Sequence, residues 1–585
     1  MHHPLSAPEF IAYDATGISM MQPGWRRFQH CVESVRVYAV DQVMPALQRA
    51  DAWACQGDYV AGFITYEAAP AFDPALRTHP RGSLPLAWLG CFRTVTSLEL
   101  PLPEPTAHAG LDWSPSINEE QYLDAVAQVR RWIEQGDTYQ VNFTWRLRTP
   151  YCGHPWQLFL AMVHAQHPCY GAYCDIGDQV ICSASPELFF TRHADLLTCR
   201  PMKGTAPRGL TTDDDRLQAQ RLRDSEKERA ENLMIVDMMR NDLGRIAAPG
   251  LVKAPSLFDA ERYDTLWQMT STVRARSAAP LDRLFAALFP CASITGAPKI
   301  RTSEIIAQLE TTPRGIYTGC VGFIAPGGDA QFNVAIRTAH LNRTTGQLEY
   351  GIGSGITWDS RGASEFAECL LKARIVSEPY PSFDLLETLL WTPSGGYFLQ
   401  EAHLRRLADC AEYFGFPVDL LSVRDALQQA AAVLPSQRHR VRCLVTRLGQ
   451  GRVEAHPIGA PSRRALRVAL ADHPIDPCDR FLYHKTTHRA VYNTACAAAP
   501  EADDVLLWNP NGEVTESARA NVVIRLDGQL LTPPVRCGLL AGVYRAHLIS
   551  TGRIREAVIL KTDLMRAQHI YLVNSVRGWM PAVLG

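Results

Sequence analysis

The spacing of apolar and polar positions changes along the chain and predicts a mixed α and β fold. Residues 119–137 (EEQYLDAVAQVRRWIEQGD) place apolar side chains three and four positions apart, which is typical of an amphipathic helix. Residues 319–326 and 329–341 are rich in β-branched and aromatic residues, which favours strands. A second helix is predicted over residues 364–374 (SEFAECLLKAR). Helical and extended segments therefore alternate, without a repeat period or a low-complexity tract.

Two stretches rich in proline and small residues divide the chain. Residues 101–116 predict a loop between subdomains, and residues 377–382 (SEPYPS) predict a domain boundary, because a new apolar run, FDLLETLLW, follows. At 585 residues the chain is too long for one ordinary hydrophobic core. We expect an N-terminal subdomain over 1–110, a catalytic domain over 117–376 and a C-terminal domain over 383–585.

Composition narrows the class of function. The 58 lysines and arginines nearly balance the 60 acidic residues, and the chain has no long basic run, which argues against nucleic acid and anionic membranes as partners. No apolar stretch reaches the roughly 20 residues that span a bilayer, and the start, MHHPLSAPEF, does not resemble a secretion signal. The sixteen cysteines include no C-x-x-C pair. We expect a cytoplasmic protein with free thiols that acts on small molecules.

Two candidate chemical residues lie in the first half of the chain. Lys203 stands between Pro201 and Gly204, where a sharp turn would direct its amine into a cleft, although a lone loop lysine is most often solvated. Glu187 follows Pro186 at the end of an extended segment and is a candidate general acid or base, with a solvated glutamate as the alternative.

Four glutamates form two pairs with helical spacing. Glu228 and Glu231 are three positions apart and share a helix face, and Glu365 and Glu368 repeat this spacing. Either pair alone is typical of a solvated helix surface. If the two pairs face each other, they repel unless a cation lies between them, and carboxylate oxygens with room for water and substrate suit Mg2+.

A glycine-rich segment and an arginine are candidates for binding an anion. Residues 351–355 (GIGSG) lack the following helix of a dinucleotide-binding motif, so we expect a turn whose N–H groups approach an anion, or else a plain hairpin. Arg337 ends an extended segment and could pair with a carboxylate, with an ordinary strand-end charge as the alternative.

Taken in order, these segments resemble the chorismate-utilising enzymes. The resemblance covers most of residues 118–374 and rests on SPELFF, PMKGTAPRG, KERAENLMIVDMMRNDLGRI, SITGAPKIR, GCVGFI, NVAIRT and GIGSGITWDS with SEFAECLLKAR. This family includes anthranilate, isochorismate, salicylate and aminodeoxychorismate synthases. The resemblance implies a large two-sheet α/β fold around a chorismate cleft.

The resemblance also implies roles for these residues. Lys203 favours the aminodeoxychorismate synthases, because anthranilate synthases typically have a small residue there. It would attack C2 of chorismate and expel the C4 hydroxyl, with Glu187 as general acid or base, before ammonia adds at C4 and displaces the lysine. Glu231 and Glu368 would bind Mg2+ directly, supported by Glu228 and Glu365. The implied substrate contacts are Arg337, Gly353, Ser354, Thr295 and Tyr317.

Two features of this sequence differ from those of some members of the family. Gln268 stands where many members have histidine, which puts one contact beside the substrate ring in doubt. The tryptophan-binding L-L-E-S pattern of feedback-regulated anthranilate synthases is absent near the N-terminus, which favours the aminodeoxychorismate synthases.

The C-terminal region carries a second set of candidates. Arg406 lies on a predicted amphipathic helix, Lys485 is isolated, and Glu516 follows a predicted hairpin turn at Asn511 and Gly512. Each alone is most often a solvated charge. Together they resemble the branched-chain and D-amino-acid aminotransferase group of pyridoxal-phosphate enzymes, which includes aminodeoxychorismate lyase, and imply a fold-type IV domain.

This second resemblance implies how a cofactor binds. Lys485 would form the Schiff base with pyridoxal phosphate, and Glu516 would keep the pyridine nitrogen protonated. Arg406 would hold the phosphate, with help from Gly542, Val543 and Ser575. In a lyase, the freed lysine would remove the C4 proton and pyruvate would leave, so that the ring becomes aromatic. Transamination is the alternative outcome.

We therefore hypothesise a fused enzyme that makes 4-aminobenzoate from chorismate for folate synthesis. The chain has no G-x-C-x-G segment of a glutamine amidotransferase, so ammonia would come from a separate glutaminase subunit. The alternatives are an anthranilate- or salicylate-type enzyme with an appended aminotransferase, and a non-catalytic partner that recruits a glutaminase. The oligomeric state stays open, with a homodimer through the C-terminal domain as one alternative.

Overall fold

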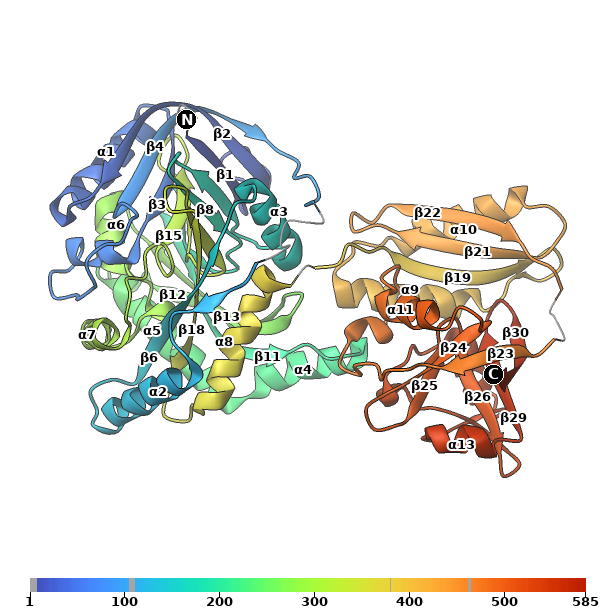
Figure 1. Cartoon of the computed structure of the whole chain (residues 1–585). Coiled ribbons are helices and arrows are strands. Elements are labelled where there is room, and N and C mark those ends of the chain that lie inside the picture. The colour runs from blue at the N-terminus through green and yellow to red at the C-terminus, as the bar shows by residue number, and fades with distance from the viewer. Residues whose placement is uncertain (1–7, 105–110, 379, 461–463) are drawn as a thin grey trace. The chain divides into compact units, whose positions relative to one another are not determined.

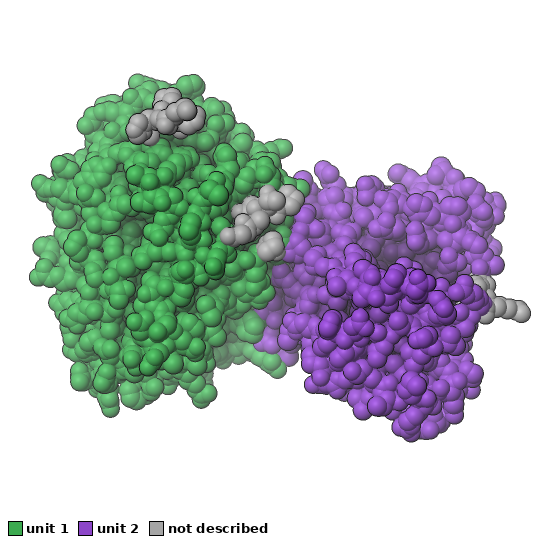
Figure 2. Space-filling view, in the orientation of Figure 1, with its two compact units in different colours: residues 1–207, 219–380 green, residues 208–218, 381–585 purple. Residues whose placement is uncertain are grey.

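The chain forms two compact units, which Figure 2 colours separately. The computed structural model describes residues 8–104, 111–378, 380–460 and 464–585. The first unit contains Met1–Pro207 and Ala219–Tyr380, and the second contains Arg208–Gln218 and Pro381–Gly585. Parts of three predicted features lie outside the described residues: the N-terminal start, the loop at 101–116 and the boundary at 377–382. The predicted domain limits stay predictions, and they did not anticipate that Arg208–Gln218 belongs with the second unit.

The first unit is built around one large β structure with helices packed against it (Figure 1). Over the described residues, hydrogen bonds connect its 18 strands into one network. Its strands of four or more residues are β1 (Glu9–Asp14), β2 (Gly24–Val37), β3 (Tyr59–Ile64), β4 (Ala87–Ser97), β6 (Gln140–Pro150), β7 (Ala172–Asp175), β8 (Gln179–Ser183), β9 (Leu188–His193), β10 (Leu196–Arg200), β11 (Met202–Pro207), β12 (Lys253–Arg262), β13 (Leu266–Arg276), β15 (Cys320–Ile324), β16 (Ala330–Asn333), β17 (Thr338–Asn342) and β18 (Gln347–Ile356).

Helices cover this β structure and carry several of the candidate residues. Those whose residues lie wholly or partly in the first unit are α1 (Val43–Cys55), α2 (Glu119–Glu134), α3 (Pro155–Gln166), α4 (Thr212–Asp224), α5 (Glu226–Gly244), α6 (Leu281–Leu288), α7 (Lys299–Leu309) and α8 (Gly362–Ser377). Helix α5 packs against β11 and β13, and α8 packs against β18. Strand β18 pairs antiparallel with β6 along its whole length. These contacts place α5 beside β11 and α8 beside β18.

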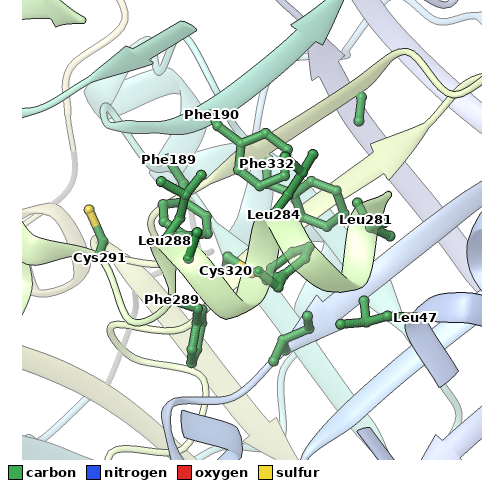
Figure 3. Packing of buried hydrophobic residues seen from close by; sticks show 14 of the residues in the cluster. Leu47, Phe189, Phe190, Leu281, Leu284, Leu288, Phe289, Cys291, Cys320 and Phe332 are labelled. Carbon is green, nitrogen blue, oxygen red and sulfur yellow. The ribbon is translucent and has the colours of Figure 1, made fainter. Parts of the chain in front are cut away.

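Burial of apolar side chains explains why α6 lies where it does. Leu281, Leu284 and Leu288 recur three and four positions apart, so they share one face of the helix. Figure 3 shows this face packed among Phe189 and Phe332 from the β structure. All five side chains are at most 1% exposed. Burying each such side chain stabilises the fold by about 1.5–3 kcal/mol, which fixes the helix against the strands.

The second unit contains two smaller sheets. A four-stranded sheet has the order β20 (Gly396–Tyr397), β19 (Leu385–Thr392), β21 (His439–Val445) and β22 (Gly451–Pro457). The other contains β23 (Leu466–Leu470), β24 (Asp504–Trp508), β25 (Val514–Ser517), β26 (Asn521–Leu526), β27 (Gln529–Thr532), β28 (Arg555–Glu556), β29 (His569–Asn574) and β30 (Gly578–Leu584). The helices are α9 (Gln400–Phe414), α10 (Leu420–Val433), α11 (Ala490–Ala498), α12 (Val543–Ser550) and α13 (Lys561–Arg566).

Several predictions from the sequence pattern are confirmed and one is wrong in detail. The mixed α/β class is confirmed, and the helix predicted over 119–137 is α2, whose start is capped by a reciprocal hydrogen-bond pair between Asn118 and Gln121. The extended segment predicted over 329–341 is two strands, β16 and β17. The break contains Arg337, whose φ of 51° leaves the β region.

The structure also bears on the cysteines and on membranes. All sixteen cysteines are free, and ten of them are buried, as expected for thiols that pack like small apolar side chains. Within the described parts of the chain, no helix combines the length and apolarity needed to cross a bilayer.

Candidate active sites

A cavity of about 180 Å3 in the first unit collects candidate residues that are far apart in sequence. Strands β11 and β18 and helices α5 and α8 contribute to its wall. The predicted residues that line it are Glu187, Lys203, Glu228, Glu231, Tyr317, Arg337, Gly353, Glu365 and Glu368. A lysine, a buried glutamate and the four glutamates with helical spacing thus face one space.

Lys203 lies in strand β11 and not in the loop predicted from its proline and glycine neighbours. A bulge between Met202 and Thr205 interrupts the pairing of this strand with β13, which produces the irregular backbone that the prediction took for a turn. Burial lowers the pKa of the Lys203 amine, an effect that Glu231 opposes and Lys372 reinforces. A lowered pKa increases the fraction of neutral amine, which is the form that attacks carbon.

Glu187 is almost completely buried, with 2% of its surface exposed. Burial raises its pKa to about 7, although a hydrogen bond from Ser293 and the charge of Lys203 both lower it. The Ser293 hydroxyl donates to Glu187 Oε1 at 2.5 Å. A carboxyl that titrates near neutrality can both donate and accept a proton, so Glu187 has the property that a general acid or base needs.

The four glutamates face the cavity from two helices. Burial raises the pKa of both Glu228 and Glu231, and neighbouring glutamates raise them further. Glu368 differs, because Lys372 lowers its pKa through an ion pair of 2.7 Å between Lys372 Nζ and Glu368 Oε1. The carboxylates therefore repel one another, and part of this charge is balanced by lysines.

These carboxylates can hold a cation only if water and substrate oxygens supply its remaining ligands. In the described residues, no group of three or more His, Cys, Asp or Glu side chains is arranged to hold a metal ion. Mg2+ commonly takes one or two protein carboxylates and completes its six ligands with water and substrate oxygens. The hard oxygen donors fit such a site, and so do the burial and the neighbouring glutamates that raise the pKa of Glu228 and Glu231.

The glycine-rich segment is part of a strand, which corrects the predicted turn. Residues 351–355 belong to β18 and pair with β6, while β17 pairs with β18 only as far as Tyr350. A Cβ at Gly355 would lie 2.5 Å from Lys203 Nζ, and one at Gly351 would lie 2.2 Å from the Tyr317 ring. The glycines therefore allow the strand to approach the cavity residues closely.

Three predicted substrate contacts have other partners in the structure. Ser354 points away from the cavity and shares a hydrogen bond of 2.8 Å with the Tyr122 hydroxyl. The Thr295 hydroxyl donates to the Cys291 carbonyl at 2.9 Å and is completely buried. Arg337 does line the cavity and donates to the Lys372 carbonyl at 2.7 Å. The predicted substrate contacts of Arg337, of Thr295 and of the backbone amide at Ser354 stay predictions.

Gln268 lines the same cavity and contacts the backbone beside Lys203. Its Nε2 donates to the Gly204 carbonyl at 2.8 Å. The Gln268 side chain therefore contacts the strand next to Lys203.

Reasoning from sequence missed two residues that line this cavity, Ser293 and Lys372, and one beside its Gly355, Gln140. Ser293 is hydrogen-bonded to Glu187, and Lys372 pairs with Glu368. Gln140 is completely buried, its side-chain amide has no hydrogen-bond partner among the described residues, and its Nε2 lies 3.0 Å from where a Gly355 Cβ would be. Lys372 could have been found from its i, i+4 spacing to Glu368, whereas the other two are distant in sequence from their neighbours.

The second unit has a larger cavity, of about 710 Å3, around Lys485 and Glu516. Burial lowers the pKa of Lys485 to about 8, and the positive charge of Arg406 lowers it further. Burial raises the pKa of Glu516 to about 7, against hydrogen bonds from Tyr492 and the Leu540 amide. A lysine that readily loses its proton and a buried carboxyl therefore face the same space.

The residues predicted to hold a phosphate line this cavity. Arg406, Gly542, Val543 and Ser575 all belong to its wall, and α12 begins at Val543 with Gly542 as its N-cap. The N–H groups of a helix start attract an anion. Arg406 also donates two hydrogen bonds, of 2.8 and 2.7 Å, to the buried carboxylate of Glu387. This ion pair holds the guanidinium in place.

Positive charge dominates the wall of the second cavity. Its arginines are Arg406, Arg440, Arg442, Arg464, Arg489, Arg519 and Arg577. Together with Lys485 they outnumber the acidic lining residues, Asp503, Asp504 and Glu516, by eight to three. This excess suits a ligand with several negative charges.

Comparison with known families divides the chain in a similar way. A family model described as chorismate binding enzyme matches residues 22–378, and a model described as amino-transferase class IV matches residues 384–584. The first match covers more than half of the chain.

Similar proteins come from several bacteria. Aminodeoxychorismate synthase component 1 of Salmonella typhimurium is 39% identical over 290 residues, which are 49% of this chain and 63% of that protein. The Bacillus subtilis protein of the same name is 37% identical over 289 residues, 49% of this chain and 60% of that protein. The chain thus spans less than two thirds of the length of these curated relatives.

A solved structure shares the fold of the first unit. Anthranilate synthase component I from Streptococcus pneumoniae aligns with a TM-score of 0.53 and 22% identity, over 65% of this chain and 94% of that chain. At this identity the likeness concerns the fold alone.

Proposed function

Because the chain belongs to the family of chorismate binding enzymes, and its C-terminal part matches class IV aminotransferases, we propose that it makes 4-aminobenzoate from chorismate. The first unit replaces the C4 hydroxyl of chorismate with an amino group and releases water. The second unit removes the enolpyruvyl group of this product as pyruvate and leaves 4-aminobenzoate. The relatives named aminodeoxychorismate synthase component 1 support the first activity.

The observation that carries this proposal is the pairing of Lys203 with Glu187 in one cavity. The neutral Lys203 amine attacks C2 of the ring, the double bond shifts, and the C4 hydroxyl leaves as water with a proton from Glu187. Ammonia then adds at C4, the double bond shifts back, and the bond to Lys203 breaks. Burial lowers the pKa of Lys203 and raises that of Glu187 to about 7, which favours the neutral amine and the protonated acid that this step needs.

Mg2+ belongs to the same proposal. Glu231 and Glu368 would be its protein ligands, with Glu228 and Glu365 beside them, and a substrate carboxylate would supply further oxygens. Bound Mg2+ supplies positive charge that offsets the repulsion between the glutamates and the carboxylates of chorismate. Positioning of the substrate by Arg337 and by the backbone of β18 belongs to the same arrangement.

The residues on the wall of the second cavity are of the types that bind pyridoxal phosphate. Lys485 and Glu516 lie on its wall, and Arg406, Gly542, Val543 and Ser575 would hold the phosphate. Bound pyridoxal phosphate supplies an electron sink for carbanion chemistry. Lys485, with its pKa lowered to about 8, can accept a proton from C4 of the substrate near neutral pH. Glu516 would keep the pyridine nitrogen protonated.

The positive lining of this cavity favours elimination of pyruvate over transamination of an ordinary amino acid. The aminated product of the first unit carries two carboxylates, whereas a simple amino acid carries one. Eight cationic and three acidic side chains on the wall suit the dianion better.

Ammonia and assembly complete the proposal. The relatives are called component 1, a name that implies a second component, and we propose that a separate glutamine amidotransferase supplies ammonia to the first unit. A cytoplasmic location and a homodimer through the C-terminal unit are further parts of the proposal. An anthranilate-type enzyme is the second candidate, because anthranilate synthase components are also among the similar proteins.

A pair of single variants tests the division of labour. Purified Lys485→Ala protein, given chorismate, Mg2+ and ammonium, should accumulate 4-amino-4-deoxychorismate without 4-aminobenzoate. Lys203→Ala protein should form neither from chorismate, yet should still convert added 4-amino-4-deoxychorismate to 4-aminobenzoate and pyruvate. Chromatography with mass detection follows both products. Full amination by Lys203→Ala, or pyruvate release by Lys485→Ala, would remove the assigned role from that lysine.

A further inference from the structure

The second unit includes an eleven-residue segment, Arg208–Gln218, that comes from the middle of the chain. The segment follows β11, which carries Lys203, and includes the start of α4. Its own conformation is fixed by Asp215, which accepts two hydrogen bonds from Arg208, at 2.7 and 2.8 Å, and one from the Gly209 amide at 2.9 Å. The side chains of Arg208 and Asp215 are each 5% exposed. The segment is therefore a well-packed part of the second unit.

Two backbone carbonyls of this segment form hydrogen bonds with aromatic side chains of the second unit. The Tyr413 hydroxyl donates to the Gly209 carbonyl at 2.8 Å, and His484 Nε2 lies 3.1 Å from the Leu210 carbonyl. The rings of Tyr413 and His484 are stacked with centroids 4.0 Å apart. The Arg208 guanidinium lies 4.3 Å from the Tyr413 ring centroid and donates to the Tyr413 carbonyl at 2.7 Å. The segment thus contacts both rings of the stack.

His484 makes this contact relevant to the second cavity, because the next residue is Lys485. Burial lowers the pKa of His484 to about 3, and the charge of Arg208 lowers it further, against the hydrogen bond with Leu210. The ring is therefore neutral at working pH, and its Nε2 carries the hydrogen that points at the Leu210 carbonyl. The Lys485 carbonyl accepts a hydrogen bond from the Leu386 amide at 3.0 Å, which holds the backbone on the other side.

Further polar contacts anchor the segment to α9. The Thr212 hydroxyl donates to the Asp409 carbonyl at 3.0 Å. Arg216 forms a two-bond ion pair with Glu412, at 2.7 and 2.5 Å, although both side chains are half-exposed and such pairs contribute little to stability. The buried hydrogen bonds to Tyr413 and His484 therefore matter more than this ion pair.

We propose that Arg208–Gln218 is a positioning segment for the second active site: through Leu210 and His484 it fixes the backbone that carries Lys485. This inference rests on the proposed role of Lys485. It means that the C-terminal sequence does not contain its whole site, because a part of the scaffold is encoded within the sequence of the amination domain. The surface around Tyr413 and His484 is then a binding site for this one segment of the same chain.

The test uses the full chain loaded with pyridoxal phosphate. His484→Phe keeps an aromatic ring for the Tyr413 stack but loses the donor to Leu210, whereas His484→Gln restores a donor. We expect His484→Phe to bind pyridoxal phosphate roughly three- to tenfold more weakly, which is the loss expected from one net hydrogen bond. We also expect it to shift the pH midpoint of the visible absorption of the lysine-bound cofactor, with His484→Gln closer to the native protein.

Two further variants separate positioning from general damage. His488→Phe changes an aromatic side chain three residues after Lys485 that lies 4.5 Å from Phe481 and has no bond to the segment, so it should leave both readouts unchanged. Gly209→Ala acts from the segment itself, because a Cβ there would lie 2.2 Å from the Asp215 amide. We expect Gly209→Ala to weaken cofactor binding in the second unit as His484→Phe does.

The possible results lead to distinct conclusions. Equal cofactor affinity and an equal midpoint in His484→Phe and the native protein would overturn the positioning role, and so would an equal loss in His484→Phe, His484→Gln and His488→Phe. If the native protein itself shows no lysine-bound cofactor, the proposed function of the second unit fails instead. Urea unfolding of each variant, followed by circular dichroism, verifies that the comparison is made between folded proteins.

Discussion

Replacing Ser293 should change the pH at which the first site works. The Ser293 hydroxyl donates to the buried carboxylate of Glu187, whose pKa is already raised to about 7 by burial. A hydrogen bond to a charged group contributes about 1.5–3 kcal/mol, and one pKa unit corresponds to about 1.36 kcal/mol. Ser293→Ala removes an interaction that stabilises only the charged form, so the pKa of Glu187 should rise by about one to two units.

The role of Glu187 decides which limb of the pH profile moves to higher pH. If the protonated carboxyl gives its proton to the leaving hydroxyl, activity falls as pH rises through its pKa, and Ser293→Ala should move this alkaline limb upward. If the ionised form acts, the acidic limb moves upward instead. Ser293→Thr keeps the hydroxyl and should retain the native profile.

The assay is the pH dependence of kcat/KM for chorismate in the amination step. Free ammonia is held constant at each pH, because ammonium itself titrates in this range. Ser277→Ala is a matched control, since Ser277 is buried in the same unit but donates to the Ile246 carbonyl and does not line the cavity. An unchanged profile in Ser293→Ala, a downward shift, or the same shift in Ser277→Ala would refute the reasoning.

Four further predictions follow from the two sites. Removing Mg2+ with EDTA should abolish amination, because the glutamates and substrate carboxylates then repel each other. Release of pyruvate from added 4-amino-4-deoxychorismate should continue. Undiminished amination would exclude the metal from the reaction. Glutamine should not replace ammonium for the purified chain, and product formed from glutamine without a second protein would contradict the proposed partner. Glu516→Gln should lower kcat of pyruvate release at least tenfold with cofactor still bound, measured by a coupled pyruvate assay, and native kcat would remove its role. A cut within residues 377–382 should give two folding halves, with the C-terminal half binding cofactor more weakly unless the peptide 208–218 is added, as measured by fluorescence titration; equal binding without the peptide would contradict the positioning segment.

Much of the first site could be predicted because its residues lie in short, recognisable patterns. The i, i+3 spacing of Glu228 with Glu231 placed both on one helix face, and α5 presents them to the cavity as that spacing requires. Family resemblance added Lys203 and Glu187, which local pattern alone could not distinguish from solvated charges. Both line the cavity.

Other features depend on contacts that no local pattern records. The bulge in β11 and the strand conformation of residues 351–355 arise from pairing with β13 and β6, so a turn predicted from proline or glycine content was wrong. Ser293 is 106 residues from Glu187, and its role follows only from the folded structure. The assignment of Arg208–Gln218 to the second unit likewise depends on contacts with residues about 200 positions away.

The most direct test of the account is the product balance of the native chain. Purified protein loaded with pyridoxal phosphate is incubated with chorismate, Mg2+ and ammonium, and 4-aminobenzoate, pyruvate, anthranilate and salicylate are measured together over time. We expect 4-aminobenzoate and pyruvate in equal amounts, without anthranilate or salicylate. Formation of anthranilate or salicylate, or pyruvate without 4-aminobenzoate, would contradict it.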